Sequence, residues 1–211
     1  RHDRVEKNPP SLQTAPLRPS DWLYGFRYLR VAEWVRGLQT ERILLHPIMP
    51  RESLLQALRN PERPTVSVEF FPPKDERSAE TMLRTARTLQ PLGIDFASIT
   101  YGAGGTSRDT TLSYGTELVK MGFPLIGHLT CVGHPKQELA SIIVDYDRAG
   151  FSGILALRGD PPKGQVHFTP HPEGFAHASE LVEWIGSQRP GRFAVGVAGF
   201  PEGHPDAVDQ A

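Results

Sequence analysis

The stretch SGILALRGD, residues 152–160, carries the two features that decide the fold. Its first six residues form a short apolar run that is typical of a buried β-strand. The polar residues that follow at once, Arg158, Gly159 and Asp160, place a cation, a small residue and an anion where that strand would end. Apolar runs of the same kind start near residues 65, 94, 124 and 193. Most intervals between them are about 30 residues, the length of one βα unit.

The segments between these runs have the apolar spacing of amphipathic helices. Apolar strands that alternate with such helices predict a parallel sheet covered by helices. Both a doubly wound sheet and a (β/α)8 TIM barrel fit this order, and because only about five βα units are visible, a barrel would be incomplete in this chain. The predicted strands are 65–71, 94–101, 124–131, 152–157 and 193–200, and the predicted helices run through 82–89, 109–121, 135–149 and 174–187.

The first 63 residues differ in composition from the rest, so we divide the chain into 1–63 and 64–211. The beginning of the chain is polar and rich in proline, which favours an extended conformation. A helix is predicted from Asp21 to about Leu38, and a second, short helix at 51–58. The strongest apolar anchors of the first helix are Trp22, Phe26 and Trp34.

Composition excludes several classes of function. The 211 residues have a net charge of −1, so no basic field would attract nucleic acid or anionic lipid. No apolar window is long enough to span a membrane, and the single cysteine, Cys131, excludes an internal disulfide framework. His167, His171 and His177 match no standard zinc spacing, so no metal site is expected. We expect a soluble, cytoplasmic protein.

Polar or glycine-containing segments follow each predicted strand. Parallel strands bring their carboxyl ends to one rim, which is where barrel proteins build their active sites. Glu69 lies between the apolar residues Val68 and Phe70, a setting that favours the neutral carboxyl form and suits a general acid near neutral pH. The structural alternative is a carboxylate that caps loop amides or pairs with an arginine.

Two other rim segments could likewise either bind a ligand or have a purely structural role. Arg158 could hold a phosphate or an electron-rich ring, with Gly159 admitting a ligand to the backbone, but it could also form a local salt bridge with Asp160. The glycine-rich segment 102–107 precedes a predicted helix, so its amides suit a phosphate or a ribose, and a plain turn fits equally well.

Five motifs in series resemble those of the methylenetetrahydrofolate reductase family over about residues 64–211. They are VEFFPP at 68–73, ITYGA at 99–103, HLTC at 128–131, ALRGD at 156–160 and VAGFPEGHP at 197–205. The resemblance implies a (β/α)8 barrel that binds FAD at the carboxyl ends of its strands. It further implies that NADH or NADPH reduces the flavin, which then reduces methylenetetrahydrofolate in the one-carbon metabolism that supplies methionine biosynthesis.

The resemblance also assigns roles to residues. Glu69 is similar to the family's catalytic acid, which protonates the folate nitrogen as the five-membered ring opens. Asp160 resembles an aspartate that lies near the flavin and the pterin, and Phe200 stands where many members have a tyrosine that contacts flavin and substrate. His177 also replaces a common tyrosine. The remaining flavin positions implied are Thr100, Tyr101, Ala103, His128, Arg158, Gly159, Ala178, His204 and Ala207.

Two other functions remain open. The first is a reductase of the same substrate that transfers hydride directly from the nicotinamide without flavin, which Phe200 and His177 permit. The second is a non-catalytic assembly or regulatory subunit, which the incomplete barrel and the aromatic helix at 22–38 suggest. In either case, and in a flavoenzyme too, a homo-oligomer or a second chain could complete the barrel.

Overall fold

The computed structural model describes residues 54–55, 58–59, 64–101, 108–161 and 169–200. These residues contain a five-stranded parallel sheet in which the strands follow one another in the order β1-β2-β3-β4-β5. The strands are β1 (Ser67–Phe70), β2 (Phe96–Ile99), β3 (Leu125–Thr130), β4 (Gly153–Leu157) and β5 (Ala194–Val197). Each of them falls inside one of the five predicted runs.

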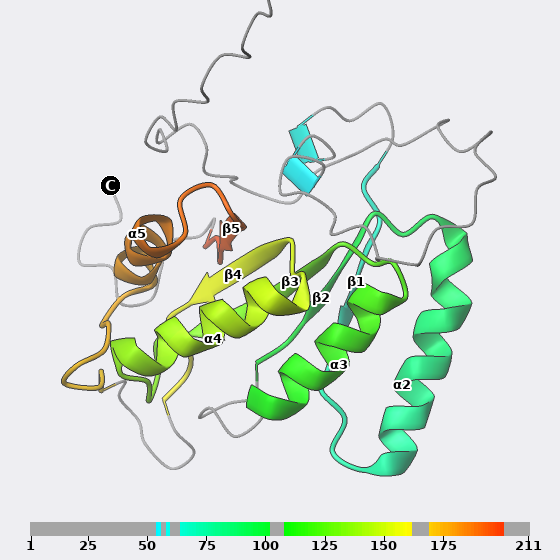
Figure 1. Ribbon diagram of the computed structural model, residues 1–211, viewed down its shortest axis with the longest axis horizontal. Helices are drawn as coiled ribbons and strands as arrows, with labels where there is room; N and C mark the ends of the chain where they lie inside the picture. Colours follow the sequence, from blue (N-terminus) through cyan, green and yellow to red (C-terminus); the bar gives the residue numbers. More distant parts are fainter. Residues whose placement is uncertain (1–53, 56–57, 60–63, 102–107, 162–168, 201–211) are drawn as a thin grey trace, which may run out of the picture.

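The strand order distinguishes between the two architectures that the sequence allows. A doubly wound sheet reverses its strand order and carries helices on both faces, whereas a (β/α)8 barrel adds strands in sequence and keeps its helices outside. Here the order is sequential, and α2, α3 and α4 lie side by side on one face of the sheet (Figure 1). The chain therefore has the barrel fold, and the described part contains five of its strands.

The helices between the strands are α2 (Glu76–Leu89), α3 (Arg108–Lys120), α4 (Lys136–Ala149) and α5 (Ala178–Gln188), with a 3-10 turn η2 at Gln90–Leu92. Asp75 caps α2 by accepting a hydrogen bond from the Ser78 amide at 2.7 Å, and Gly150 ends α4 in the left-handed conformation. The prediction for the last helix was wrong at its start, because α5 begins at Ala178 rather than at 174. The Glu180 carboxylate accepts from the amides of Ala176 and His177 and so fixes the start there.

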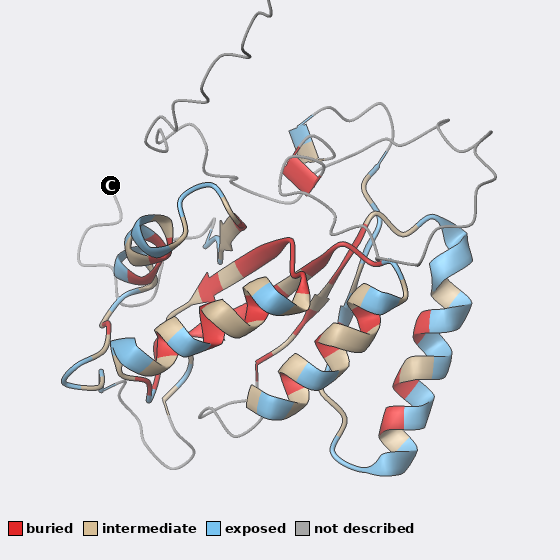
Figure 2. Cartoon of the chain, in the orientation of Figure 1, coloured by how far each residue is buried: buried red, intermediate tan, exposed pale blue. Residues whose placement is uncertain are grey.

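The two faces of the sheet have different surroundings, since successive strand residues point to opposite sides. The outer face packs against the buried sides of the helices and forms the main core, which appears as red stripes on helices and strands in Figure 2. Strand residues of this core are Phe70, Ala97, Ile99, Leu125, Leu129, Ile154 and Ala156, and helix residues include Met82, Leu118, Leu139, Ile142, Leu181 and Ile185.

The inner face has a smaller apolar cluster at the amino ends of the strands. Leu54 and Leu55, both buried, pack with Phe96 at the start of β2 and Ala194 at the start of β5. The backbone is helical at 54–55 and 58–59, which overlap the short helix predicted at 51–58. This cluster covers the end of the sheet opposite to the strand-end rim, so the rim is left for polar residues.

Some predictions fall on residues outside the described ranges. These are the helix from Asp21 to Leu38, the segment 102–107 with Ala103, and His167, His204 and Ala207. Within the part of the chain that the structure describes, no helix is long and apolar enough to cross a membrane.

Candidate active site at the carboxyl ends of the strands

Glu69 lies on the inner face of β1, in register with Ser98 of β2. Its apolar neighbours Val68 and Phe70 belong to the outer core, because they point to the opposite side of the strand. The Glu69 side chain is 48% exposed, so the apolar setting expected from its neighbours in sequence is not what the carboxylate meets. The Ser98 hydroxyl donates to Glu69 Oε2 at 3.5 Å.

His128 on β3 is a titratable neighbour of Glu69. Its Nε2 lies 3.4 Å from Glu69 Oε2, and its side chain is 9% exposed. Burial lowers the pKa of His128 below its ordinary value, and the negative charge of Glu69 offsets part of that effect. The contact does not have hydrogen-bond geometry, so within the described residues Nε2 has no hydrogen-bond partner. A neutral imidazole with an unsatisfied nitrogen is available to a ligand at this rim.

Thr130 follows His128 by two residues and shares its face of the sheet. It is buried, and its hydroxyl also has no hydrogen-bond partner among the described residues. Buried polar groups in proteins are nearly always satisfied. Two such groups side by side on the inner face of β3 therefore indicate a site whose ligand completes their hydrogen bonds.

The surroundings of Gly159, in the segment after β4, leave no room for a side chain at this position. The residue has a φ of 86°, and a Cβ placed on it would lie 2.6 Å from Val132 Cγ1 and 3.1 Å from Thr130 Cβ. The Val132 amide donates to the Arg158 carbonyl at 3.1 Å, which ties this segment to the end of β3. Arg158 is half-buried and Asp160 is exposed. Glycine thus lets the chain turn close to Thr130 and Val132.

The other predicted site residues lie in different parts of the structure, and not all of them face the inner rim. The Thr100 carbonyl accepts from Thr111 Oγ1 at 3.1 Å, so Thr100 sits at the rim with its backbone fixed. The Tyr101 side chain is buried in the outer core rather than on the inner face. Ala178 begins α5 next to the end of β3, because Cys131 Sγ lies 3.6 Å from the His177 carbonyl oxygen. Phe200 is 51% exposed after β5.

A hollow of about 500 Å³ lies beside β1 and α2, and Glu69 lines it. Phe71, which is 70% exposed, lines it too. Most of the other lining residues belong to α2, among them Arg77, Thr81 and Met82, so the hollow lies between the edge of β1 and that helix. Within the described residues no cluster of histidine, cysteine, aspartate or glutamate could hold a metal ion.

These residues fit a flavin at the rim. The unsatisfied atoms of His128 and Thr130 can hydrogen-bond a polar ring edge or a phosphate chain. Ser98 and Glu138 are residues of this region that the sequence reasoning missed. Glu138 could have been found from its spacing, since it follows His134 by four residues at the start of a predicted helix.

A sequential parallel sheet with helices outside and polar groups at the carboxyl ends of its strands defines a barrel protein with a rim site. Comparison with known families shows which family of barrel proteins this chain belongs to. The family model described as methylenetetrahydrofolate reductase matches residues 54–211, and the chain belongs to that family.

Individual relatives agree with this assignment. Methylenetetrahydrofolate reductase (NADH) 1 of Zea mays is 37% identical over 158 residues, which are 74% of this chain and 26% of that protein. Methylenetetrahydrofolate reductase 2 of Saccharomyces cerevisiae is 36% identical over 161 residues, again 74% of this chain and 26% of the relative. The 5,10-methylenetetrahydrofolate reductase of Pectobacterium carotovorum is 36% identical over 161 residues, 74% of this chain and 51% of its own. The chain thus spans about a quarter of the plant and yeast proteins and half of the bacterial one.

Proposed function

We propose that this protein reduces 5,10-methylenetetrahydrofolate to 5-methyltetrahydrofolate, with FAD at the strand-end rim and NADH or NADPH as the reductant. The observation that carries the proposal is the grouping of Glu69, Ser98 and His128 on the inner face of three successive strands. Family membership supports the substrate. When bound, the flavin supplies the hydride chemistry, and the residues of the chain hold the reactants and move the proton.

Glu69 is the proposed proton donor. Its side chain is 48% exposed on the inner face of β1, so it can reach a substrate bound at the rim. Protonating the folate nitrogen assists opening of the five-membered ring and produces the iminium that accepts hydride. The Ser98 hydroxyl donates to Oε2, which His128 Nε2 also approaches at 3.4 Å, so the other oxygen, Oε1, can face the substrate.

The remaining rim residues are proposed to bind the cofactor. His128 and Thr130 would satisfy their buried polar atoms on it, and the segment from Arg158 to Asp160 would approach it through backbone and charge. Asp160, exposed at the rim, would influence the flavin potential through its negative charge and would contact the folate. Because β1 and β5 are the outer strands of the described sheet, we also propose that a second copy or another chain covers them.

The test separates the two halves of the reaction. In Glu69→Gln, reduction of the flavin by NADH or NADPH should proceed as in the wild type, while reoxidation by methylenetetrahydrofolate should slow by about 100-fold or more, the usual contribution of a general acid. Glu183→Gln, which changes an exposed carboxylate on α5, is the matched control and should affect neither half.

Three results would contradict the proposal. Equal reoxidation rates for the wild type and Glu69→Gln would remove the catalytic assignment. Reduction of the substrate by protein that holds no flavin would favour direct hydride transfer from the nicotinamide. Absence of both half-reactions in protein of the native mass expected for a complete assembly would favour a non-catalytic subunit.

A further inference from the structure

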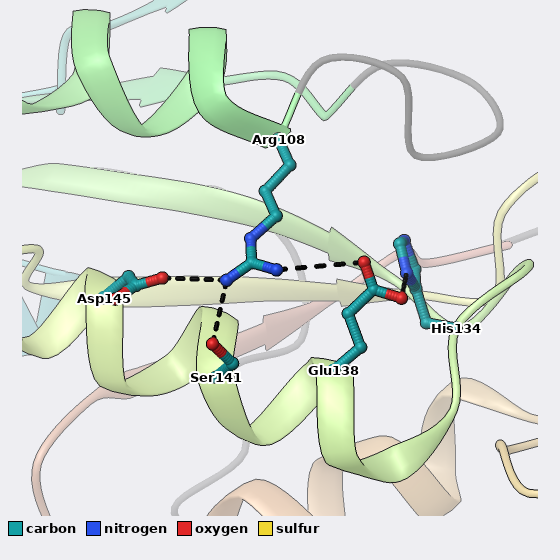
Figure 3. A network of polar contacts seen from close by, with 5 residues as sticks. All are labelled: Arg108, His134, Glu138, Ser141 and Asp145. Atoms are coloured by element: carbon teal, nitrogen blue, oxygen red, sulfur yellow. Dashed lines mark hydrogen bonds and ion pairs between the residues drawn. The ribbon is translucent and has the colours of Figure 1, made fainter.

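A group of polar contacts joins the start of α3 to α4, away from the inner face (Figure 3). Arg108, the first residue of α3, places Nη2 2.9 Å from Asp145 Oδ2 and 2.9 Å from Ser141 Oγ. Its other terminal nitrogen, Nη1, lies 3.9 Å from Glu138 Oε1 in the first turn of α4. One guanidinium group therefore ties the amino end of α3 to three positions along α4.

Glu138 extends this group to the loop that follows β3. Its second oxygen, Oε2, lies 3.0 Å from Nδ1 of His134, an ion-pair distance although the angle is not that of a hydrogen bond. The His134 side chain is only 5% exposed, and its ring packs edge-on against Tyr101 with 5.6 Å between centroids. Glu138 thus stands between Arg108 on α3 and the His134–Tyr101 pair.

The elements that meet at Glu138 are those that follow two neighbouring strands of the rim. Tyr101 comes directly after Thr100 at the end of β2, and His134 comes four residues after Thr130 at the end of β3. Hydrogen bonds tie the backbone at these strand ends to the neighbouring strands. The Thr100 amide donates to the Phe70 carbonyl at 2.9 Å, and the Cys131 amide donates to the Leu157 carbonyl at 3.0 Å.

We propose that Glu138 is a positioning residue that holds the carboxyl ends of β2 and β3 at the spacing a bound flavin requires. This rests on the proposed function, because the flavin is what uses the spacing. A half-exposed carboxylate that contacted only one helix would contribute little. Glu138 instead contacts an arginine of α3 and a buried histidine of the β3–α4 loop, and it can restrain both strand ends at once.

Asp147 offers a matched control on the same helix. It lies near the other end of α4 and contacts two arginines, with Oδ1 2.5 Å from Arg192 Nε and Oδ2 3.7 Å from Arg189 Nε. Its contacts join α4 to the chain before β5, at the amino end of that strand. Removing the Asp147 carboxylate should therefore lower the stability about as much as removing the Glu138 carboxylate does, but without disturbing the rim.

The experiment compares Glu138→Ala, Glu138→Gln and Asp147→Ala in the full chain. The measurements are the FAD dissociation constant from flavin fluorescence, the melting temperature, and amide hydrogen exchange at Thr100, Cys131 and Val132. Glu138→Ala should raise the dissociation constant about tenfold more than Asp147→Ala does, as loss of a charge-assisted contact predicts. Glu138→Gln should recover most of the loss, since glutamine keeps the size of the side chain and its amide oxygen can still accept from Arg108. Exchange at the three amides should be faster in Glu138→Ala only.

The outcomes separate this inference from the function on which it rests. Equal flavin affinity and equal amide exchange in Glu138→Ala and Asp147→Ala would overturn the positioning role, while flavin binding by the wild type would still support the proposed function. If the wild type binds no FAD but exchange at the strand ends rises only in Glu138→Ala, the restraint on the rim stands and the flavin assignment fails.

Discussion

Glu69 on β1 and His128 on β3 meet across β2, with Oε2 and Nε2 3.4 Å apart. Neighbouring strands of a sheet lie about 4.8 Å apart, so the two long side chains reach toward each other over Ser98 of β2. The contact couples the charge of the proposed acid to a buried imidazole.

The first prediction concerns the protonation of His128. Burial holds the pKa of His128 below its ordinary value of 6.5, and the charge of Glu69 raises it in part. In Glu69→Gln the second influence disappears, so the pKa of His128 should fall further. Titration of the imidazole protons by nuclear magnetic resonance measures both values. An unchanged pKa in Glu69→Gln would show that the two groups are not coupled.

The same shift predicts how stability depends on pH. Since the pKa of His128 is lower in the folded chain than in the unfolded chain, the unfolded chain binds a proton first as the pH falls below 6.5. The free energy of unfolding should therefore decrease with falling pH, and His128→Gln should make that decrease smaller. Urea unfolding at about pH 7.5 and about pH 5.5 compares the two proteins. If the free energy of unfolding fell by the same amount in the wild type and in His128→Gln, His128 would not be a source of the pH dependence.

Gly159 should tolerate no side chain. Gly159→Ala should destabilise the fold because its Cβ would lie 2.6 Å from Val132 Cγ1 and the residue keeps a φ of 86°. Gly191→Ala is the control, since Gly191 has a φ of 68° with nothing within 4 Å of the added carbon. The control should lose about 1–2 kcal/mol from backbone strain alone, and Gly159→Ala at least about 1 kcal/mol more from the close contact. Equal losses of stability in the two variants would show that the Val132 side chain can move away from the added Cβ at little cost.

Leu54 should contribute to the stability of the sheet although it precedes β1. It is 2% exposed and packs with Phe96 and Ala194, so Leu54→Ala should lower the free energy of unfolding by about 2–5 kcal/mol. Leu92→Ala, at a leucine that is 68% exposed, should change it by less than about 0.5 kcal/mol. Equal effects in chemical denaturation would mean that the residues before β1 pack only loosely on the barrel interior.

Much of the fold could be predicted from the sequence, because strand and helix periods differ and both are strong here. Five strands were expected and lie inside the expected runs. The choice between a barrel and a doubly wound sheet could not be made from periodicity, since both have the same order of elements along the chain, and only the family resemblance predicted the barrel. The choice depends on which strands pair, and pairing is a contact between residues about 30 positions apart, a property of the βα unit rather than of local pattern.

The site was predicted less completely. Grouping polar residues at the strand ends followed from parallel strands alone, and Glu69 and His128 do meet there. The environment of Glu69 was misjudged, because its neighbours in sequence face the other side of the strand. The contacts of Glu138 with Arg108 and His134 join residues of separate elements, and only the packing of α3 on α4 reveals them.

Binding of FAD by Thr130→Val tests the central claim, that the inner rim of the sheet holds a flavin. Valine has nearly the shape of threonine and removes a buried hydroxyl that has no partner among the described residues. The variant should therefore be at least as stable as the wild type. The wild type should bind FAD saturably with one flavin per site, and Thr130→Val should bind it about three- to tenfold more weakly. No saturable binding by the wild type, or equal affinity in the variant, would contradict a flavin at this rim.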